Sequence, residues 1–146
     1  MIAGHHEEEG FIDYIKDDKR IIYLKALPVE EINHLENHSL ANINPRPYSE
    51  EFDQYSIPSK TIEYLSSSSV TISLYNSILY PLFENEMIWA KDNEIKTLED
   101  CLNKALTMNE TERKDMINNA KNKAKSRYSL KIINEKIDLF LTKNFQ

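Results

Sequence analysis

The sequence predicts a mixed α/β fold, in which a parallel sheet carries helices on both faces and a helical tail follows. Through roughly the first two thirds of the chain, short apolar runs typical of strands alternate with segments of helical periodicity. The last third shows helical patterns only. A chain of 146 residues suits one domain, expected over residues 1–146, and can bury roughly 68 to 70 percent of its unfolded surface.

The first elements alternate between helix and strand. Residues 7–16 predict a helix that Gly10 interrupts. Residues 21–27 are dense in β-branched and large apolar side chains, which predicts a buried parallel strand. Residues 28–38 predict a helix opened by proline, with two glutamates in its first turn, where acids complement the helix dipole.

Three further strands are expected around one long loop. A short strand over residues 40–43 leads into a polar loop, residues 45–57, after which Pro58 opens a helix. Residues 70–74 predict the next strand, and residues 87–90 an edge strand. Ligands of open α/β sheets bind at the carboxyl ends of the strands, so the loop lies where a binding loop is expected.

Three helices form the predicted tail. Thr97 and Asp100 form an approximate capping box ahead of an apolar stripe. This stripe consists of Leu98, Cys101, Leu102, Ala105 and Leu106. Asn109 caps a second helix that runs to about Lys125, and Ser129 caps a third. The third helix has apolar side chains on one face, namely Leu130, Ile133, Ile137, Phe140 and Leu141.

Composition limits the classes of partner. A net charge of −6 and a pI near 5.3 argue against general nucleic-acid binding. Basic residues nevertheless crowd the tail: Arg113, Lys114, Lys121, Lys123, Lys125, Arg127 and Lys131. They could touch phosphates or an anionic membrane, although the solvated side of a helix pair is the favoured interpretation.

The single cysteine and the absence of long apolar runs predict a cytoplasmic protein. Cys101 cannot form an internal disulfide, suits a reducing compartment, and is expected to be buried rather than nucleophilic. No apolar run is long enough for a membrane span, and the amino terminus lacks the form of a signal peptide. We expect at most peripheral contact with the inner face of the plasma membrane.

The start of the Pro58 helix is a candidate anion site. Its first amides and the positive end of its dipole attract anions, and the neighbours of Ser59 leave such amides free. Lys60 adds a positive charge, and Glu63 offers two acceptor oxygens suited to vicinal hydroxyls. An ordinary helix start with a solvated i,i+3 pair explains the same spacing, and spacing alone favours it.

The histidines and tyrosines are weaker candidates. His34 and His38 have a metal-binding spacing but no evident third ligand, and His5 and His6 follow a predicted strand end. Surface positions are favoured for both pairs, and no metal is expected. Among the tyrosines, the two in the loop, Tyr48 and Tyr55, are the candidates for stacking on a sugar.

The loop and helix together resemble a known family. Residues 44–46, Asn-Pro-Arg, are followed by a loop containing Glu50, Glu51 and Asp53, and then by residues 58–65, Pro-Ser-Lys-Thr-Ile-Glu-Tyr-Leu. These segments resemble the donor site of bacterial family 4 glycosyltransferases, retaining enzymes of the GT-B architecture with two Rossmann-like domains. Since the similarity covers nearly the whole chain, it implies a single Rossmann-like donor domain whose amino-terminal acceptor domain is absent.

The resemblance implies a site and a function. The implied nucleotide-sugar site consists of Arg46, Tyr55, Pro58, Ser59, Lys60 and Glu63. Glu63 matches the carboxylate that binds the ribose hydroxyls, and Lys60 matches a basic residue near the pyrophosphate. The implied donor is a UDP- or GDP-sugar held without metal or cofactor. The implied activity is hexosyl transfer in surface polysaccharide or lipopolysaccharide synthesis, inactive in the isolated domain, with a glycan or lipid-linked sugar acceptor bound by the absent domain.

Three departures from the family pattern support an alternative. Tyr55 stands where a second glutamate is common, and Lys25 where glycine is more frequent. Residues 66–69, four serines, replace a turn that usually contains glycine, and a serine with left-handed backbone angles would cost about a kcal/mol or more. The alternative is a non-catalytic remnant or interaction module that keeps the fold.

Overall fold

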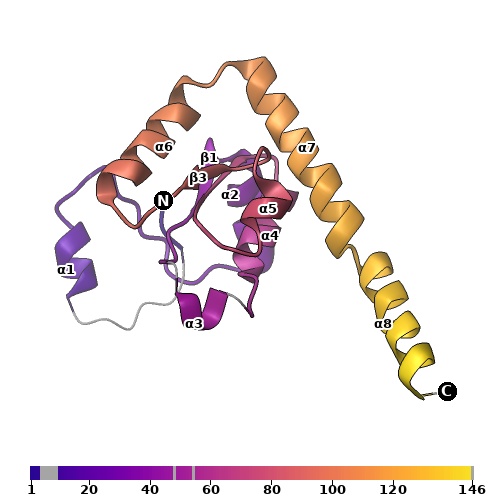
Figure 1. Cartoon of the computed structure of the whole chain (residues 1–146). Helices are drawn as coiled ribbons and strands as arrows, with labels where there is room; N and C mark the ends of the chain where they lie inside the picture. Colours follow the sequence, from indigo (N-terminus) through magenta and orange to yellow (C-terminus); the bar gives the residue numbers. More distant parts are fainter. Residues whose placement is uncertain (4–9, 48, 54, 146) are drawn as a thin grey trace. The chain divides into compact units, whose positions relative to one another are not determined.

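The computed structural model describes residues 1–3, 10–47, 49–53 and 55–145 (Figure 1). The chain divides into two compact units, Met1–Leu35 and Glu36–Gln146. The prediction of one domain over residues 1–146 stays a prediction, and each unit is described by itself. Among the described residues, no helix is long and apolar enough to cross a membrane.

A small parallel sheet lies at the centre of the Glu36–Gln146 unit and confirms the mixed α/β class. Its strands are β1 (Ala41–Asn44), β2 (Val70–Leu74) and β3 (Ile88–Ala90), in the order β1-β2-β3. Both pairings are parallel, with Asn42 opposite Thr71 and Ser73 opposite Trp89. The predicted strand over residues 70–74 is thus confirmed, and β3 forms an edge of the sheet as predicted.

Helices lie before, between and after these strands along the chain (Figure 1). Along the chain they are α1 (Phe11–Ile15), α2 (Val29–His38), α3 (Glu50–Asp53), α4 (Ser59–Ser66), α5 (Tyr80–Phe83), α6 (Ile95–Thr107), α7 (Glu110–Tyr128) and α8 (Leu130–Phe145). The boundary between the two units falls within α2. The short helices α3 and α5 are not predicted from the sequence, because one turn is too short to show a helical period.

The core of this unit contains two apolar clusters. In the first, side chains from β2 and β3 pack against α6: Val70, Ile72, Leu74, Ile88, Ala90, Cys101, Ala105 and Met108. In the second, Met87 and Trp89 from the β3 segment pack against side chains of α4, α5 and α7. Its members are Leu65, Leu79, Phe83, Met87, Trp89, Ala120 and Ala124. Neighbouring residues along β3 fall into different clusters because successive strand side chains point to opposite faces. Helices therefore pack on both faces of this sheet.

The predicted strand over residues 21–27 is wrong. The Met1–Leu35 unit has one parallel bridge there, between Ile2 and Tyr23, and the side chain of Ile22 is 52% exposed. The extended run cannot continue through Lys25, whose φ of 58° lies in the left-handed region. An apolar run becomes a strand only where a neighbouring strand pairs with it over several residues.

Helix α1 covers Phe11–Ile15 of the helix predicted over residues 7–16. Residues 4–9 lie outside the described part of the chain, so the first three residues of that prediction fall there, as do His5 and His6. Gly10 directly precedes α1, with a left-handed φ of 94°. Glycine adopts that angle at little steric cost, which explains why α1 begins at Phe11.

The predicted capping box of α6 is also wrong. The helix begins after Glu94, so Thr97 and Asp100 lie inside it, and Asp100 pairs with Lys96 at 3.1 Å. On the predicted stripe, Cys101 and Ala105 are buried as expected, whereas Leu106 is 62% exposed. Leu98 and Leu102 are partly buried against the core.

The left-handed backbone of Lys25 yields a stability prediction. A non-glycine residue pays about 1–2 kcal/mol for this conformation, while glycine loses about 0.5–1 kcal/mol of extra chain entropy. We therefore expect Lys25→Gly to raise the free energy of unfolding by about 0.5–1 kcal/mol in urea denaturation. The exposed residue Lys19 lacks this backbone, so Lys19→Gly is the control and should lower stability. Equal effects of the two substitutions would contradict the explanation.

Candidate functional site

The amino terminus of α4 carries most of the predicted site. Pro58 precedes the helix as its capping residue, with φ −62° and ψ 116°, rather than lying in the first turn as predicted. It offers no side-chain cap, and its carbonyl accepts the Thr61 amide at 3.0 Å. Among the described residues no side chain caps this end, so the amides of Ser59 and Lys60 remain available to an anion.

The Lys60 ammonium lies between two carboxylates. Its Nζ donates to Glu63 Oε2 at 2.6 Å and to Glu36 Oε1 at 3.3 Å. The hydrogen bond to Glu63 is the largest cause that raises the pKa of Lys60, so the side chain stays charged. Glu63 lies one turn along α4, as the i,i+3 spacing predicts, and both of these side chains are about half exposed.

Sequence reasoning missed Glu36. It is the buried residue of α2, with a side chain only 11% exposed. The negative charge also contributes to raising the pKa of Tyr64, after burial, which is the largest cause. A signal existed in the sequence, because Glu36 follows Ile32 by four residues and so lies on an apolar face of the helix.

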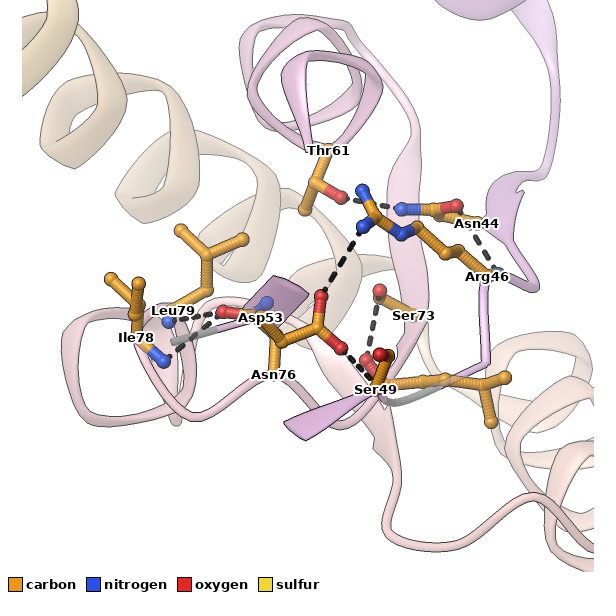
Figure 2. Close-up of polar contacts among 10 residues, drawn as sticks. Asn44, Arg46, Ser49, Asp53, Thr61, Ser73, Asn76, Ile78 and Leu79 are labelled. Carbon is orange, nitrogen blue, oxygen red and sulfur yellow. Dashed lines mark hydrogen bonds and ion pairs between the residues drawn. The ribbon is translucent and has the colours of Figure 1, made fainter. Parts of the chain in front are cut away.

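A second polar group gathers at the carboxyl ends of β1 and β2 (Figure 2). Asp53 is almost fully buried, and its carboxylate accepts the Ser49 amide at 2.7 Å and faces Arg46 Nη2 at 3.6 Å. The amide of Arg46 also donates to Asn44 Oδ1 at 3.4 Å. These contacts tie α3 to the first residues of the loop after β1.

Thr61 links this group to α4. Its hydroxyl accepts a hydrogen bond of 2.7 Å from Asn44 Nδ2, which joins the end of β1 to the first turn of the helix. Asn76, just after β2, is buried, and its Oδ1 accepts the amides of Ile78 and Leu79. Its Nδ2 is buried without a hydrogen-bond partner among the described residues. Polar side chains therefore gather at the ends of β1 and β2, the edge of an open parallel sheet at which ligands bind.

The six predicted site residues fall into three places. Pro58, Ser59, Lys60 and Glu63 share the beginning of α4. Arg46 belongs to the group around Asp53, which meets α4 through Thr61. Tyr55 is 82% exposed and contacts neither group through any interaction among the described residues. The other loop tyrosine, Tyr48, lies outside the described residues.

The serine turn after α4 does not carry the expected strain. Ser67 is extended, with φ −82° and ψ 176°, and among the described non-glycine residues only Lys25 has a positive φ. The expected cost of left-handed serine is therefore wrong. One of these hydroxyls instead bonds to a distant part of the chain, since Ser69 Oγ donates toward the carbonyls of Glu36 and Ser39 at 2.7 and 2.6 Å.

The other candidate reactive side chains that the structure describes are a cysteine and two histidines. Cys101 is buried as predicted, and its burial raises the pKa of the thiol, which disfavours the nucleophilic thiolate. Within the part of the chain that the structure describes, no group of three or more His, Cys, Asp or Glu side chains could hold a metal ion. His34 and His38 are exposed on α2, as predicted for surface histidines.

Comparisons with protein-family models, curated proteins and solved structures each find no significant match. The family resemblance therefore stays a prediction.

Proposed function

We propose that the Glu36–Gln146 unit binds a nucleoside diphosphate sugar, as the Rossmann-like donor half of a retaining family 4 glycosyltransferase. The observation that carries the proposal is the uncapped first turn of α4, with Lys60 and Glu63 on it, beside the polar carboxyl ends of β1 and β2. Open parallel sheets bind ligands at that edge. An anion and a pair of hydroxyls are the ligand features that these groups suit.

Each group has a role in the proposed complex. The diphosphate lies at the amides of Ser59 and Lys60, and the Lys60 ammonium adds positive charge. The Glu63 carboxylate accepts hydrogen bonds from the two ribose hydroxyls. During transfer, the helix dipole and Lys60 stabilise the charge that develops on the departing nucleoside diphosphate.

Nucleotide binding requires the ion pair between Lys60 and Glu63 to break. Lys60 and Glu63 bond to each other at 2.6 Å, so both must turn toward the ligand. Because both side chains are about half exposed, their pair is worth only about 0–1 kcal/mol, and breaking it costs little. Glu36 is far more buried and, at 3.3 Å from the Lys60 ammonium, holds it near the start of α4.

The wider biological role follows from the same proposal. The donor is a UDP- or GDP-sugar, and the product is a glycan of surface polysaccharide or lipopolysaccharide assembly. A glycan or lipid-linked acceptor would be bound by a second domain, at the cytoplasmic face of the membrane.

A non-catalytic module that keeps this fold is the second candidate. Two observations favour it. The charge of Lys60 is already neutralised by Glu36 and Glu63, and the exposed Tyr55 supplies no carboxylate to a donor sugar. Such a module would bind neither UDP nor GDP.

Nucleotide affinity tests the proposal. We expect Glu63→Ala to weaken UDP or GDP binding by roughly 1.5–3 kcal/mol, or about 10- to 150-fold, since a hydrogen bond to a charged group is lost. Lys60→Ala should also weaken binding. Isothermal titration calorimetry of the full chain with each nucleotide measures both effects.

The chain contains a matched control for this titration. Lys96 pairs with Glu99 at 3.3 Å, with the same i,i+3 spacing on an exposed helix surface. Lys96→Ala and Glu99→Ala should leave nucleotide affinity unchanged. If the folded wild-type chain binds neither nucleotide, the donor-site proposal fails and the non-catalytic module is favoured.

A further inference from the structure

Helix α8 exposes a continuous apolar face. The face consists of Leu130 at 79% exposed, Ile133 at 38%, Ile137 at 50%, Phe140 at 60% and Leu141 at 48%. Spacings of three, four and seven residues place these side chains on one side of the helix. The preceding helix differs, because α7 buries Ala120 and Ala124 in the core. Each of these five side chains thus leaves more than a third of its surface exposed.

Lysines lie along the borders of this face. At 100° per residue, Lys136 and Lys143 fall on one border, and Lys131 and Asp138 fall on the other. Glu135 lies on the opposite side of the helix and is 3.9 Å from Lys131. Long lysine stems can lie along an apolar boundary while their ammonium groups reach the polar zone above it.

This end of the chain carries a net positive charge. Residues 121–143 contain seven Lys and Arg against two acidic residues, a net charge of +5, although the whole chain carries −6. Two of these lysines are occupied elsewhere, since Lys121 bonds Ser68 and Lys123 bonds Glu86, each at 2.8 Å. The lysines that border the apolar face of α8 make no such long-range contact among the described residues.

Charge favours a bilayer over a second copy of the chain. In an antiparallel pair of α8 helices each border would face the same border of its partner, so Lys136 and Lys143 would repel across one seam, while Lys131 and Asp138 would attract across the other. An anionic lipid surface complements these lysines instead. Interfacial helices combine an apolar face with lysines on the polar side in this way.

We propose that α8 binds an anionic membrane surface, lying in the plane of the interface with Leu130, Ile133, Ile137, Phe140 and Leu141 inserted among the acyl chains. Lys131, Lys136 and Lys143 contact the lipid phosphates. This surface does not depend on the nucleotide site, and either proposal can fail without the other.

Co-sedimentation with lipid vesicles tests the proposal. The full chain should sediment with vesicles of phosphatidylcholine and phosphatidylglycerol in equal parts, and far less with phosphatidylcholine alone. Leu141→Glu should weaken this binding by more than about tenfold, because it places a negative charge in the inserted face. Lys136→Gln should weaken it by about fivefold, the loss expected for one lysine near an anionic surface.

Leu139 provides the matched control. Its side chain is 56% exposed, but it lies two residues from both Ile137 and Leu141 and so faces away from the apolar stripe. Leu139→Glu introduces the same charge on the side of the helix away from the lipid, and should weaken vesicle binding far less than Leu141→Glu does. Circular dichroism and urea denaturation verify that both variants are folded.

Three outcomes would overturn the proposal. The first is no binding of the folded wild-type chain to the anionic vesicles. The second is equal loss of binding in Leu141→Glu and Leu139→Glu, which would reflect charge alone. In the third, the chain does not bind the vesicles, and sedimentation equilibrium shows a dimer that Leu141→Glu dissociates. The apolar face of α8 would then be an interface between two copies of the chain.

Discussion

Replacing Phe83 by alanine should lower the free energy of unfolding by about 3–5 kcal/mol, a large fraction of the stability of a small domain. The ring is fully buried in the cluster between the sheet and α4, α5 and α7, and it stacks on Tyr128 with centroids 6.3 Å apart. Truncation removes this burial and leaves a cavity that the surrounding side chains can fill only in part. Urea denaturation followed by circular dichroism measures the change.

Phe140→Ala is the control for this substitution. Phe140 is the same residue type on α8, but its side chain is 60% exposed. Phe140→Ala should change stability by less than about 0.5 kcal/mol, as is usual at exposed positions. Similar losses in the two variants would mean that α8 is packed against the rest of the folded chain, which would also remove the basis of the membrane proposal.

Removing the Asn42 side chain should cost about 2–3 kcal/mol. This buried asparagine on β1 donates from Nδ2 to the Glu36 carbonyl and to Ser67 Oγ, both at 2.9 Å. It therefore ties the end of α2 to the turn after α4. Asn42→Ala breaks both bonds and leaves a void in a polar part of the interior. Urea denaturation measures the loss of stability.

Asn44 is the control for this substitution. It lies on the same strand, is only partly buried, and donates one hydrogen bond, to Thr61. Asn44→Ala should cost only about 1 kcal/mol. An equal cost for both variants would show that burial of the Asn42 network adds nothing to its hydrogen bonds.

In the proposed site, a sequence pattern predicts some contacts but not others. The spacing of Lys60 and Glu63 predicts their proximity, because residues three apart on a helix always share a face. The same spacing cannot show that Glu36, 24 residues earlier in the chain, also reaches Lys60. Arg46 and Asp53 likewise meet through the path of the loop. The path of a loop has no periodic sequence pattern from which it could be predicted.

By itself, the sequence determined the elements whose signals are local. Asn109 caps α7 through the Glu112 amide at 2.9 Å, as predicted, and the apolar run at residues 70–74 forms β2. A cap or a helical face is settled within a turn or two of the chain, so neighbouring residues contain the information.

Only the tertiary structure decided which apolar and charged groups find partners. Residues 21–27 have the composition of a strand, yet only Tyr23 forms a bridge. The apolar faces of α6 and α8 look alike in sequence, but one packs on the sheet and the other is exposed. The physical reason is that strand pairing and burial depend on which distant segment lies opposite, and a local pattern does not specify that segment.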